Sequence, residues 1–407
     1  MKVLLVGSGG REHALAWKLA ESARDIELHA APGNPGIATL GECHPVRADD
    51  AEALLGLARS LAAGLAVIGP EAPLVAGVAD ELRHAGVAVL GPGRAAARIE
   101  GSKTFAKDVM RVAGVPTAVT LPVARPPCVV KVDGLAAGKG VFVCRTLEEL
   151  DAALAAATAF AGPLLIEELL EGPEISLFAL CDGRNVHGLV PAQDFKRIGD
   201  GDTGPNTGGM GSYAPVPAFG SERVDELLDL VHRPVVAELA RRGTPFFGLL
   251  YAGLMLTETG PKVLEFNCRF GDPETQSILP LLEGDFVGAL ATAAAGDLSN
   301  VSLSAANDRA AVTVVLAGGE YPARNDHGTA IEGLADAEAT GALLFHAGTA
   351  LHDGRLVTNG GRILNVTATG GSLAEARDRA YAACERISFQ GMRYRRDIAE
   401  AAVTSAT

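Results

Sequence analysis

The sequence has few aromatic residues, no excess of positive charge and no long apolar run. Aromatic side chains make up 5% of its 407 residues, and the formal net charge is −14. Because phosphate backbones and anionic membranes attract basic surfaces, this charge argues against a nucleic-acid or membrane partner. It leaves room for a local basic pocket that binds a small phosphate ligand. No apolar stretch approaches the length of a bilayer, and charges follow the short apolar N-terminal run at once. We therefore expect a soluble cytoplasmic protein.

Cysteine and histidine are not arranged as metal ligands along the chain. The six cysteines form no C-x-x-C pair and do not lie at zinc spacing from a histidine. The nine histidines are scattered, so we do not expect a histidine-based metal site. The cysteines are interpreted as buried or idle thiols of a protein in a reducing compartment.

Apolar residues are plentiful, and their pattern changes along the chain. They make up 48% of the sequence, which argues against disorder, and the length predicts two to four domains. Up to about residue 101, apolar runs ending in glycine-rich loops alternate with helix-periodic segments, which predicts a doubly wound parallel sheet. The middle of the chain is β-rich. The C-terminal part, with turn signals at "HDG" and "NGG", indicates a small hairpin-rich domain.

The loop "GSGGREH" follows the first predicted strand. It is not the dinucleotide fingerprint, because Arg11 and Glu12 precede the expected last glycine. The loop is either a tight turn or an anion site at a helix N-terminus, and Arg11 and His13 favour a phosphorylated small molecule. "APGNPG" and "GPEAPLV" follow later strands, so they could share the same crevice.

Two further stretches are rich in glycine, lysine and glutamate. In "KVDGLAAGKGV", Lys131 ends a strand and Lys139 lies in a Gly/Ala loop that could fold over phosphates. The stretch is not a P-loop, because its glycine spacing is one residue short and Gly140 stands where Ser or Thr would bind Mg²⁺. A hairpin turn is the alternative. In "IEELLEGPEIS", the acidic residues Glu167, Glu168 and Glu174 form either a solvated turn or a site where a carboxylate holds ribose hydroxyls.

The stretch "VLEFNCRFGDPETQ" gathers oxygen ligands and charges where a strand ends. Strand alternation places Glu265 and Asn267 on one face, where both can bind a hard cation such as Mg²⁺. Arg269 could stabilise charge on a transferring phosphoryl group. Asp272 and Glu274 could face the substrate side. The alternative is an acidic turn without function.

Taken in order, these stretches resemble the ATP-grasp superfamily, and more closely the phosphoribosylamine–glycine ligase family of purine biosynthesis. The resemblance covers nearly the whole chain. It is carried most specifically by "RFGDPETQ" and "DTGPNTGGMG", and also by "EGSKTFAKD", "YAGLM" and "TNGGRIL".

The resemblance implies a multidomain α/β fold. We expect an N-terminal doubly wound domain over residues 1–100 and an ATP-grasp domain over 101–300, with a small lid over about 115–180. A β-rich α+β domain should follow over 301–407. The implied reaction joins glycine to 5-phosphoribosylamine using ATP and Mg²⁺ or Mn²⁺, and yields glycinamide ribonucleotide, ADP and phosphate through a glycyl phosphate. The implied protein is a monomer whose partners are these small molecules.

The resemblance also assigns residues to each part of the reaction. Glu265 and Asn267 match the metal ligands. In the mechanism that we expect for this reaction, the catalytic residues are Arg269, which stabilises the oxyanion, and Asp272, which orients the amine. The positions that match the ATP site are Lys103, Lys131, Gly134, Gly138, Lys139, Gly140, Glu167, Glu168, Leu169, Leu170 and Glu174. The positions that match the substrate surfaces are Gly9, Gly10, Arg11, Glu12, His13, Gly33, Asn34, Gly69, Pro70, Glu71, Asp194, Lys196, Asp202, Thr203, Gly208, Gly209 and Met210.

The chain departs from the family pattern at a few places. Phe195 stands where the family usually has histidine, and no acidic residue occurs near Ala252, where other ATP-grasp enzymes often add a metal ligand. Two stretches of the lid are short, and a helix of the lid is expected to be missing.

Three rival functions are weighed against the ligase. "DTGPNTGGMG" argues against another ATP-grasp enzyme of purine synthesis. The glycine spacing and the loop of Lys139 argue against a nicotinamide-dependent oxidoreductase. Intact Glu265 and Asn267 argue against a non-catalytic nucleotide sensor.

Overall fold

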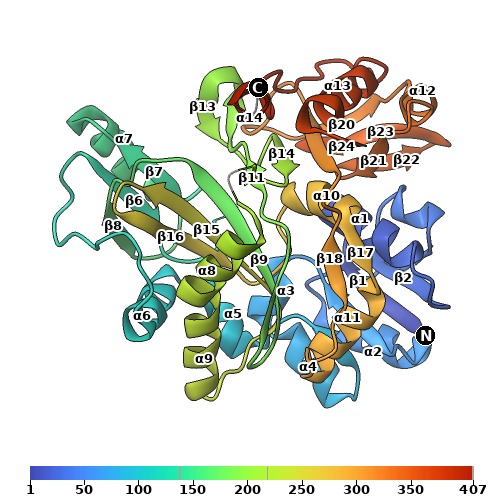
Figure 1. The fold of residues 1–407 in the computed structure, drawn as a ribbon. Helices are drawn as coiled ribbons and strands as arrows, with labels where there is room; N and C mark the ends of the chain where they lie inside the picture. The colour runs from blue at the N-terminus through green and yellow to red at the C-terminus, as the bar shows by residue number, and fades with distance from the viewer. Residues whose placement is uncertain (137–138, 218, 406–407) are drawn as a thin grey trace.

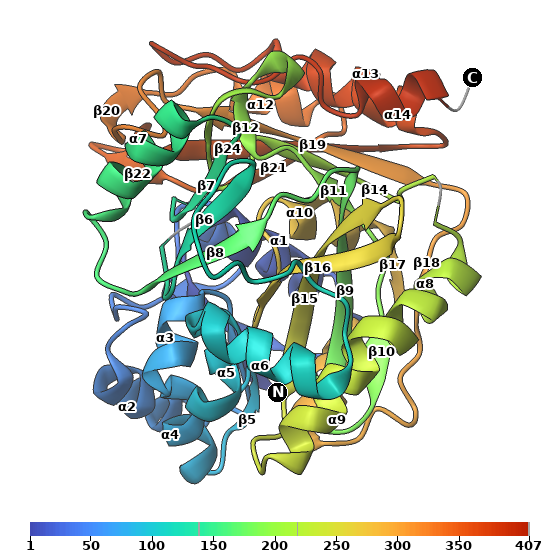
Figure 2. The same ribbon diagram turned by 90° about the vertical axis from the view of Figure 1, so that its left-hand side faces the viewer.

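The computed structural model describes residues 1–136, 139–217 and 219–405. In Figure 1 the N-terminal strands lie below the C-terminal region, and the segment of β6 to β8 projects on the opposite side of the molecule. Figure 2 places the sheet of β9, β15 and β16 between the C-terminal strands and the helices α5, α6 and α9. The N-terminal, central and C-terminal parts thus meet near the centre of the molecule.

The N-terminal part is a five-stranded parallel sheet in the order β3-β2-β1-β4-β5. Residues 3–6 of β1 are fully buried, and they pack alternately on its two faces. Leu4 and Val6 share a core with α2 and α4, whereas Val3 and Leu5 share one with α1 and α11. Helices cover both faces, so the predicted doubly wound sheet is confirmed. Its elements are β1 (Lys2–Gly7), α1 (Gly10–Ala20), β2 (Glu27–Pro32), η1 (Ile37–Thr39), β3 (Glu42–Cys43), α2 (Ala51–Leu61), β4 (Leu65–Ile68), α3 (Glu71–Ala76), α4 (Val78–His84), β5 (Ala88–Leu90) and α5 (Arg94–Gly101).

The central part contains a four-stranded antiparallel sheet, β10-β9-β15-β16, and a three-stranded sheet, β7-β6-β8. Ser102 caps α6, because its hydroxyl accepts a hydrogen bond from the Phe105 amide. The first elements are α6 (Lys103–Ala113), β6 (Cys128–Val132), β7 (Val141–Cys144), α7 (Leu147–Ala157), β8 (Leu164–Glu168), β9 (Glu174–Asp182) and β10 (Val186–Gly188). Those that follow are α8 (Ser221–Leu227), the π-helical turn η3 (Leu228–His232), α9 (Arg233–Arg241), β15 (Phe247–Thr257), β16 (Gly260–Asn267), α10 (Glu274–Ile278), η4 (Leu279–Leu281), β17 (Leu282–Gly284) and α11 (Phe286–Ala295).

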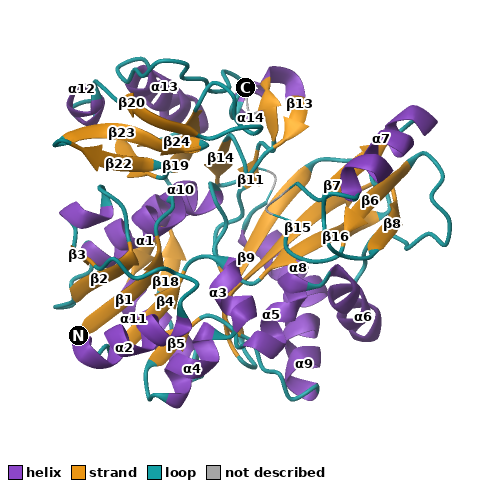
Figure 3. Cartoon of the chain, turned by 180° about the vertical axis from the view of Figure 1, so that it is seen from behind, coloured by secondary structure: helices purple, strands orange, loops and turns teal. Residues whose placement is uncertain are grey.

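The C-terminal part is built on a five-stranded sheet in the order β11-β14-β19-β24-β21. Two of these strands, β11 (Gln193–Asp194) and β14 (Gly211–Ala214), come from the middle of the chain. Figure 3 shows this β-rich region well separated from the strands β6 to β8. Its other elements are β18 (Leu303–Ala305), β19 (Ala310–Ala317), β20 (Asp326–Ala330), α12 (Leu334–Glu338), β21 (Leu343–His346), β22 (Thr349–His352), β23 (Arg355–Gly360), β24 (Arg362–Gly370), α13 (Leu373–Cys384) and α14 (Glu400–Ser405).

The turn between β22 and β23 confirms the hairpin predicted at "HDG". Asp353 and Gly354 have φ angles of 49° and 74°. Positive φ at both central positions is the signature of the tight hairpin turn whose twist matches that of the flanking strands. A separate small hairpin, β12 (Arg197–Gly199) and β13 (Thr203–Asn206), follows β11 and includes the turn η2 (Asp200–Asp202).

The six cysteines are all unpaired, and five of them are buried. Burial as free thiols agrees with the interpretation of these residues as inert core groups. Among the helices that the structure describes, none is both long and apolar enough to cross a membrane.

Candidate active site

The first glycine-rich loop is closed onto its own helix. The carboxylate of Glu12 accepts a hydrogen bond from the Gly9 amide at 2.6 Å and an ion pair from Arg11 at 2.6 Å. A Cβ at Gly69 would lie 2.1 Å from this carboxylate, so only glycine fits beside it. Glu12 therefore closes the loop after β1 and packs closely against the loop after β4, and the Gly9 amide is already satisfied.

A buried charge network joins the N-terminal part to the end of β16. The guanidinium of Arg269 lies 3.3 Å from a Glu71 oxygen and 3.2 Å from a Glu100 oxygen. Burial acts to raise the pKa of Glu71, but the charges of Arg269 and Arg11 outweigh it and hold that pKa below its ordinary value. For Glu100 burial prevails and raises the pKa. The predicted catalytic Arg269 is thus fixed by two carboxylates that come from other elements.

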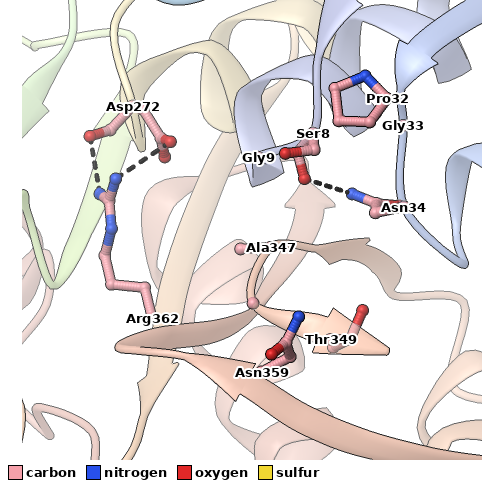
Figure 4. Close-up of a pocket in the computed structure, with 11 residues that line it drawn as sticks. Ser8, Gly9, Pro32, Gly33, Asn34, Asp272, Ala347, Thr349, Asn359 and Arg362 are labelled. Atoms are coloured by element: carbon pink, nitrogen blue, oxygen red, sulfur yellow. Dashed lines mark hydrogen bonds and ion pairs between the residues drawn. The ribbon is translucent and has the colours of Figure 1, made fainter. Parts of the chain in front are cut away.

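A polar cavity of about 460 Å³ opens at the carboxyl edge of the parallel sheet. Figure 4 shows Asp272 bound to Arg362, and Ser8 bound to Asn34, on two sides of it. The guanidinium of Arg362 lies 3.0 Å from the Asp272 carboxylate and donates to the Asp272 carbonyl at 2.8 Å. The cavity is lined by Ser8, Gly9, Pro32, Gly33, Asn34, Asp272, Ala347, Gly348, Thr349, Asn359 and Arg362. Its walls therefore come from the N-terminal sheet, the segment before α10 and the C-terminal hairpins.

Asn34 and His13 join the N-terminal part to β21. The Asn34 amide donates to the carbonyls of Ser8 and His346, both at 2.9 Å. The His13 Nδ1 accepts a hydrogen bond from the His346 backbone amide at 2.8 Å. Burial, together with the smaller effect of the neighbouring His346, lowers the pKa of His13 to about 3, so His13 is neutral. A neutral ring with an occupied Nδ1 can offer only Nε2 to a phosphate.

A second group of charges lies between β6, β8 and α6. The buried carboxylate of Glu167 pairs with Lys131 at 2.7 Å and with Lys107 at 2.6 Å. Lys103 donates to the Gly134 carbonyl at 3.0 Å, and burial lowers its pKa although Glu265 opposes that shift. Three lysines and a loop backbone thus converge in a form suited to nucleotide phosphates.

Glu265 and Asn267 lie at the end of β16, on the same face of the strand. Burial acts to raise the pKa of Glu265, yet the charges of Lys196, Lys131, Lys103 and Arg269 hold it below its ordinary value. Among the described residues, neither side chain makes a hydrogen bond or an ion pair. An ionised carboxylate and a free amide oxygen fit a hard divalent cation. On β15, Gly253 pairs directly with Glu265 and adds no side chain, whereas Tyr251 pairs directly with Asn267.

Lys196 and Asp194 lie next to this face. Lys196 pairs with Glu174 at 2.7 Å. Burial raises the pKa of Asp194 to about 8; Lys196 opposes this shift, and the carboxylates of Glu274, Glu174 and Glu265 add to it. Burial and the neighbouring carboxylates thus favour the protonated form of Asp194.

Three consecutive parts of the chain match domain descriptions of one family. The N domain of phosphoribosylglycinamide synthetase matches residues 1–100, its ATP-grasp (A) domain residues 101–275, and its C domain residues 311–401. The chain belongs to the phosphoribosylglycinamide synthetase family. The resemblance and the multidomain α/β fold class predicted from the sequence are confirmed.

Named relatives cover this member of the family from end to end. It is 52% identical over 414 residues to the phosphoribosylamine–glycine ligase of Streptomyces coelicolor, spanning 98% of this chain and 99% of that one. It is 47% identical over 424 residues to the ligase of the same name from Rhizobium meliloti, spanning 100% of both. The crystal structure of phosphoribosylamine–glycine ligase from Thermotoga maritima matches with a TM-score of 0.83 at 35% identity, covering 98% of this chain and 100% of that one.

In this family member, the loop "DTGPNTGGMG" divides into two parts. Gly208 and Gly209 lie beside the cavity, because their carbonyls accept from Arg362 and a Cβ at Gly209 would lie 2.4 Å from Pro273. Asp202 pairs instead with Arg395 at 2.7 Å, and Thr203 donates to the Asp200 carbonyl. Met210 is fully buried in a small apolar cluster. The structure therefore brings Gly208 and Gly209 to the cavity, whereas Asp202, Thr203 and Met210 serve contacts elsewhere.

The remaining predicted ATP-site residues are held in different ways. Glu168 pairs with Lys262 at 2.8 Å, and Lys139 donates to the Pro322 carbonyl at 3.3 Å. Leu169 and Leu170 are half-buried. Gly140 is buried in the loop of Lys139, and Gly138 lies outside the described residues. The family resemblance alone assigns these residues to the nucleotide, and their roles remain predictions.

Phe195, which replaces the usual family histidine, follows β11 directly. Its ring packs 4.8 Å below the Arg395 guanidinium. Between β6 and β8, in the expected lid, α7 is the single helix that the structure describes.

Sequence reasoning missed several residues of the site. Lys107 binds Glu167, and Thr349, Asn359 and Arg362 form one wall of the cavity. The stretch "TNGGRIL" contributed to the resemblance, but no residue in it was assigned a role. This stretch is far from the N-terminal loops in sequence, so the sequence could not show that both line the same cavity. For Lys107, the spacing of four residues from Lys103 along one helix was the available signal.

Proposed function

We propose that this chain joins glycine to 5-phosphoribosylamine using ATP, giving glycinamide ribonucleotide, ADP and phosphate in purine biosynthesis. The observation that carries the proposal is the position of the end of β16, which lies between the lysine-rich site and the polar cavity. Glu265 and Asn267 face the lysine-rich site, and Asp272, a few residues later, lines the polar cavity. A phosphoryl donor and an amine acceptor bound on these two sides would meet at this segment.

The lysine-rich site is proposed to bind ATP. Lys103, Lys131 and the loop of Lys139 neutralise the phosphates, and Glu167 keeps Lys131 in position through its ion pair. Glu174 binds ribose in this assignment. Glu265 and Asn267 would hold a divalent ion, Mg²⁺ or Mn²⁺, which would supply positive charge to offset that of the phosphates.

The chemistry proceeds through a glycyl phosphate. A carboxylate oxygen of glycine attacks the γ-phosphorus of ATP, and the bond to ADP breaks. The amine of phosphoribosylamine then attacks the acyl carbon and phosphate leaves. Arg269, fixed by Glu71 and Glu100, is placed to stabilise the oxyanion. Asp272 is placed to orient the amine, and Arg362 fixes Asp272.

The cavity is proposed to hold phosphoribosylamine, with glycine between it and the nucleotide. We assign residues 1–100 to amine binding, 101–300 to ATP, with 115–180 as the lid, and 301–407 to closing the cavity. We further propose a monomeric enzyme that acts on small molecules. Six unpaired cysteines support a cytoplasmic location.

The assignment is tested by omission of each substrate. Protein, ATP, Mg²⁺, glycine and freshly made phosphoribosylamine are incubated together, and ADP release is measured with each component left out in turn. We expect ADP release to require both glycine and the amine. ADP release that continues at the full rate without either acceptor would overturn the proposal.

A further inference from the structure

A cluster of metal-ligating groups lies at the outer edge of the parallel sheet. His29 lies on β2, Glu42 on β3, and His44 directly after β3. The parallel pairing sets His29 opposite Glu42, and strand alternation brings His44 to the same face. None of the three lines the cavity of the candidate active site. Their spacing along the chain gave no zinc signature, because the sheet and not the local sequence brings them together.

The donor atoms are close enough to share one ion. The His29 Nδ1 lies 3.0 Å from the His44 Nε2 and 3.6 Å from a Glu42 carboxylate oxygen. One ligand atom from each residue falls within 4.8 Å of the others. Two nitrogens that bind a tetrahedral zinc ion at about 2.0–2.1 Å lie roughly 3.3 Å apart. The two imidazoles therefore need to move only slightly to bind the same ion.

A neighbouring carboxylate fixes the orientation of the His29 ring. The His29 Nε2 lies 3.1 Å from a Glu27 oxygen, and Glu27 in turn lies 3.4 Å from Lys2. With its Nε2–H donated to Glu27, His29 presents the lone pair of Nδ1 to the cluster. Metal-binding histidines almost always donate their second ring nitrogen in this way. Glu27 thus supports His29 without being a ligand itself.

We propose that His29, Glu42 and His44 bind one divalent transition-metal ion of the zinc class. Two imidazoles and a carboxylate are the donor set that such ions favour over Mg²⁺. His29 is buried, while Glu42 is exposed, so water can supply the fourth ligand. Without metal, the His44 Nε2–H donates to the His29 Nδ1. Binding moves that proton to the His44 Nδ1, which lies 4.0 Å from Glu42.

The ion would fix the two ends of the loop that carries Gly33 and Asn34. This loop leaves the sheet after β2 and returns in β3, which is only two residues long. A metal bound across β2 and β3 closes the loop and stabilises the short edge strand. The site is independent of the proposed ligase reaction, because neither the ATP site nor Asp272 contributes a ligand.

The proposal is tested by metal titration of the full chain after treatment with a chelator. Co²⁺ is added in excess Mg²⁺, which occupies oxygen-rich sites, and visible absorption reports nitrogen coordination. Competition with a chromogenic zinc chelator then gives the affinity for Zn²⁺. We expect one equivalent to bind, and His44→Ala to lower the affinity by at least about a hundredfold. Glu27→Gln, which keeps all three ligands, should lower it about 10–100-fold.

Two control variants make the outcome specific. His352→Ala removes an exposed histidine elsewhere, and Glu265→Gln removes the proposed Mg²⁺ ligand; both should still bind one equivalent. Failure of the wild-type chain to bind one equivalent would overturn the proposal. Binding that survives in His44→Ala, or that is lost in Glu265→Gln, would overturn it as well.

Discussion

At the scale of the residue, Glu265 is the carboxylate on which the ATP half of the site depends. Four cationic side chains hold it ionised, and its oxygens are free of other partners among the described residues. Glu265→Gln keeps the shape and removes the charge. We expect kcat to fall by at least about a hundredfold, because the electrostatic stabilisation of the transferring phosphoryl group is lost. Initial-rate kinetics at saturating ATP and Mg²⁺ measure this effect.

The matched control for Glu265 is Glu258, an exposed carboxylate in the turn of the same hairpin. Glu258→Gln should leave kcat within about twofold of the wild type, since exposed charges interact weakly. Equal activity in both variants would contradict the metal-binding role of Glu265.

Sequence patterns located individual residues of the site better than they revealed the partners of those residues. Alternation along one strand was enough to place Glu265 and Asn267 on one face. The same reasoning could not show that the Glu167 carboxylate is occupied by Lys107 and Lys131, because these residues lie on three different elements. Nor could it show that Glu12 satisfies the Gly9 amide, which depends on the close approach of Gly69.

At the scale of the element, Arg362 at the start of β24 holds three segments together. Its guanidinium joins the segments of Gly208 and Asp272 to β24, and Arg362 itself lines the cavity. Arg362→Ala leaves the Asp272 carboxylate buried without its cation, which is unfavourable. We expect the KM for phosphoribosylamine to rise by at least about tenfold, since the loss of one buried charged pair exceeds about 1.4 kcal/mol. The KM for ATP should change far less.

The comparison for Arg362 is Arg355→Ala, an exposed arginine on the neighbouring strand β23. It should leave both KM values unchanged. A parallel rise of the two KM values in Arg362→Ala would indicate general loss of structure and would contradict the local role of this residue.

The contact between α1 and β21 predicts sensitivity to acid. A histidine in the unfolded chain binds a proton near pH 6.5, whereas burial lowers the pKa of His346 to about 4. Between these values the unfolded state binds the extra proton, so the native state loses stability as pH falls. Below pH 4, the free energy of unfolding of His346→Gln should therefore have fallen by up to roughly 3 kcal/mol less than that of the wild type.

Urea denaturation of the wild type and His346→Gln at neutral and at acid pH measures the difference. The exposed His352→Gln serves as control, because its side chain is 78% exposed. If the stability of His346→Gln falls with pH as steeply as that of His352→Gln, the assignment of a buried neutral imidazole is wrong.

At the scale of the whole molecule, the order of the N-terminal, central and C-terminal parts could be predicted from the sequence, but the contacts between these parts could not. Apolar runs and glycine loops are local signals, and they predicted the parallel sheet and the late hairpins. The strand β14, which also pairs with β11, pairs with β19 across about a hundred residues of chain, and no local pattern encodes that pairing. The third wall of the cavity, from Thr349, Asn359 and Arg362, was hidden for the same reason.

The most direct test of the proposed reaction follows oxygen from glycine to phosphate. Glycine labelled with ¹⁸O in both carboxylate oxygens is converted in unlabelled water with ATP, Mg²⁺ and phosphoribosylamine, and the released phosphate is analysed by mass spectrometry. If the two sites work together through a glycyl phosphate, each phosphate carries one ¹⁸O and the amide product keeps the other. Unlabelled phosphate released together with product would contradict the account.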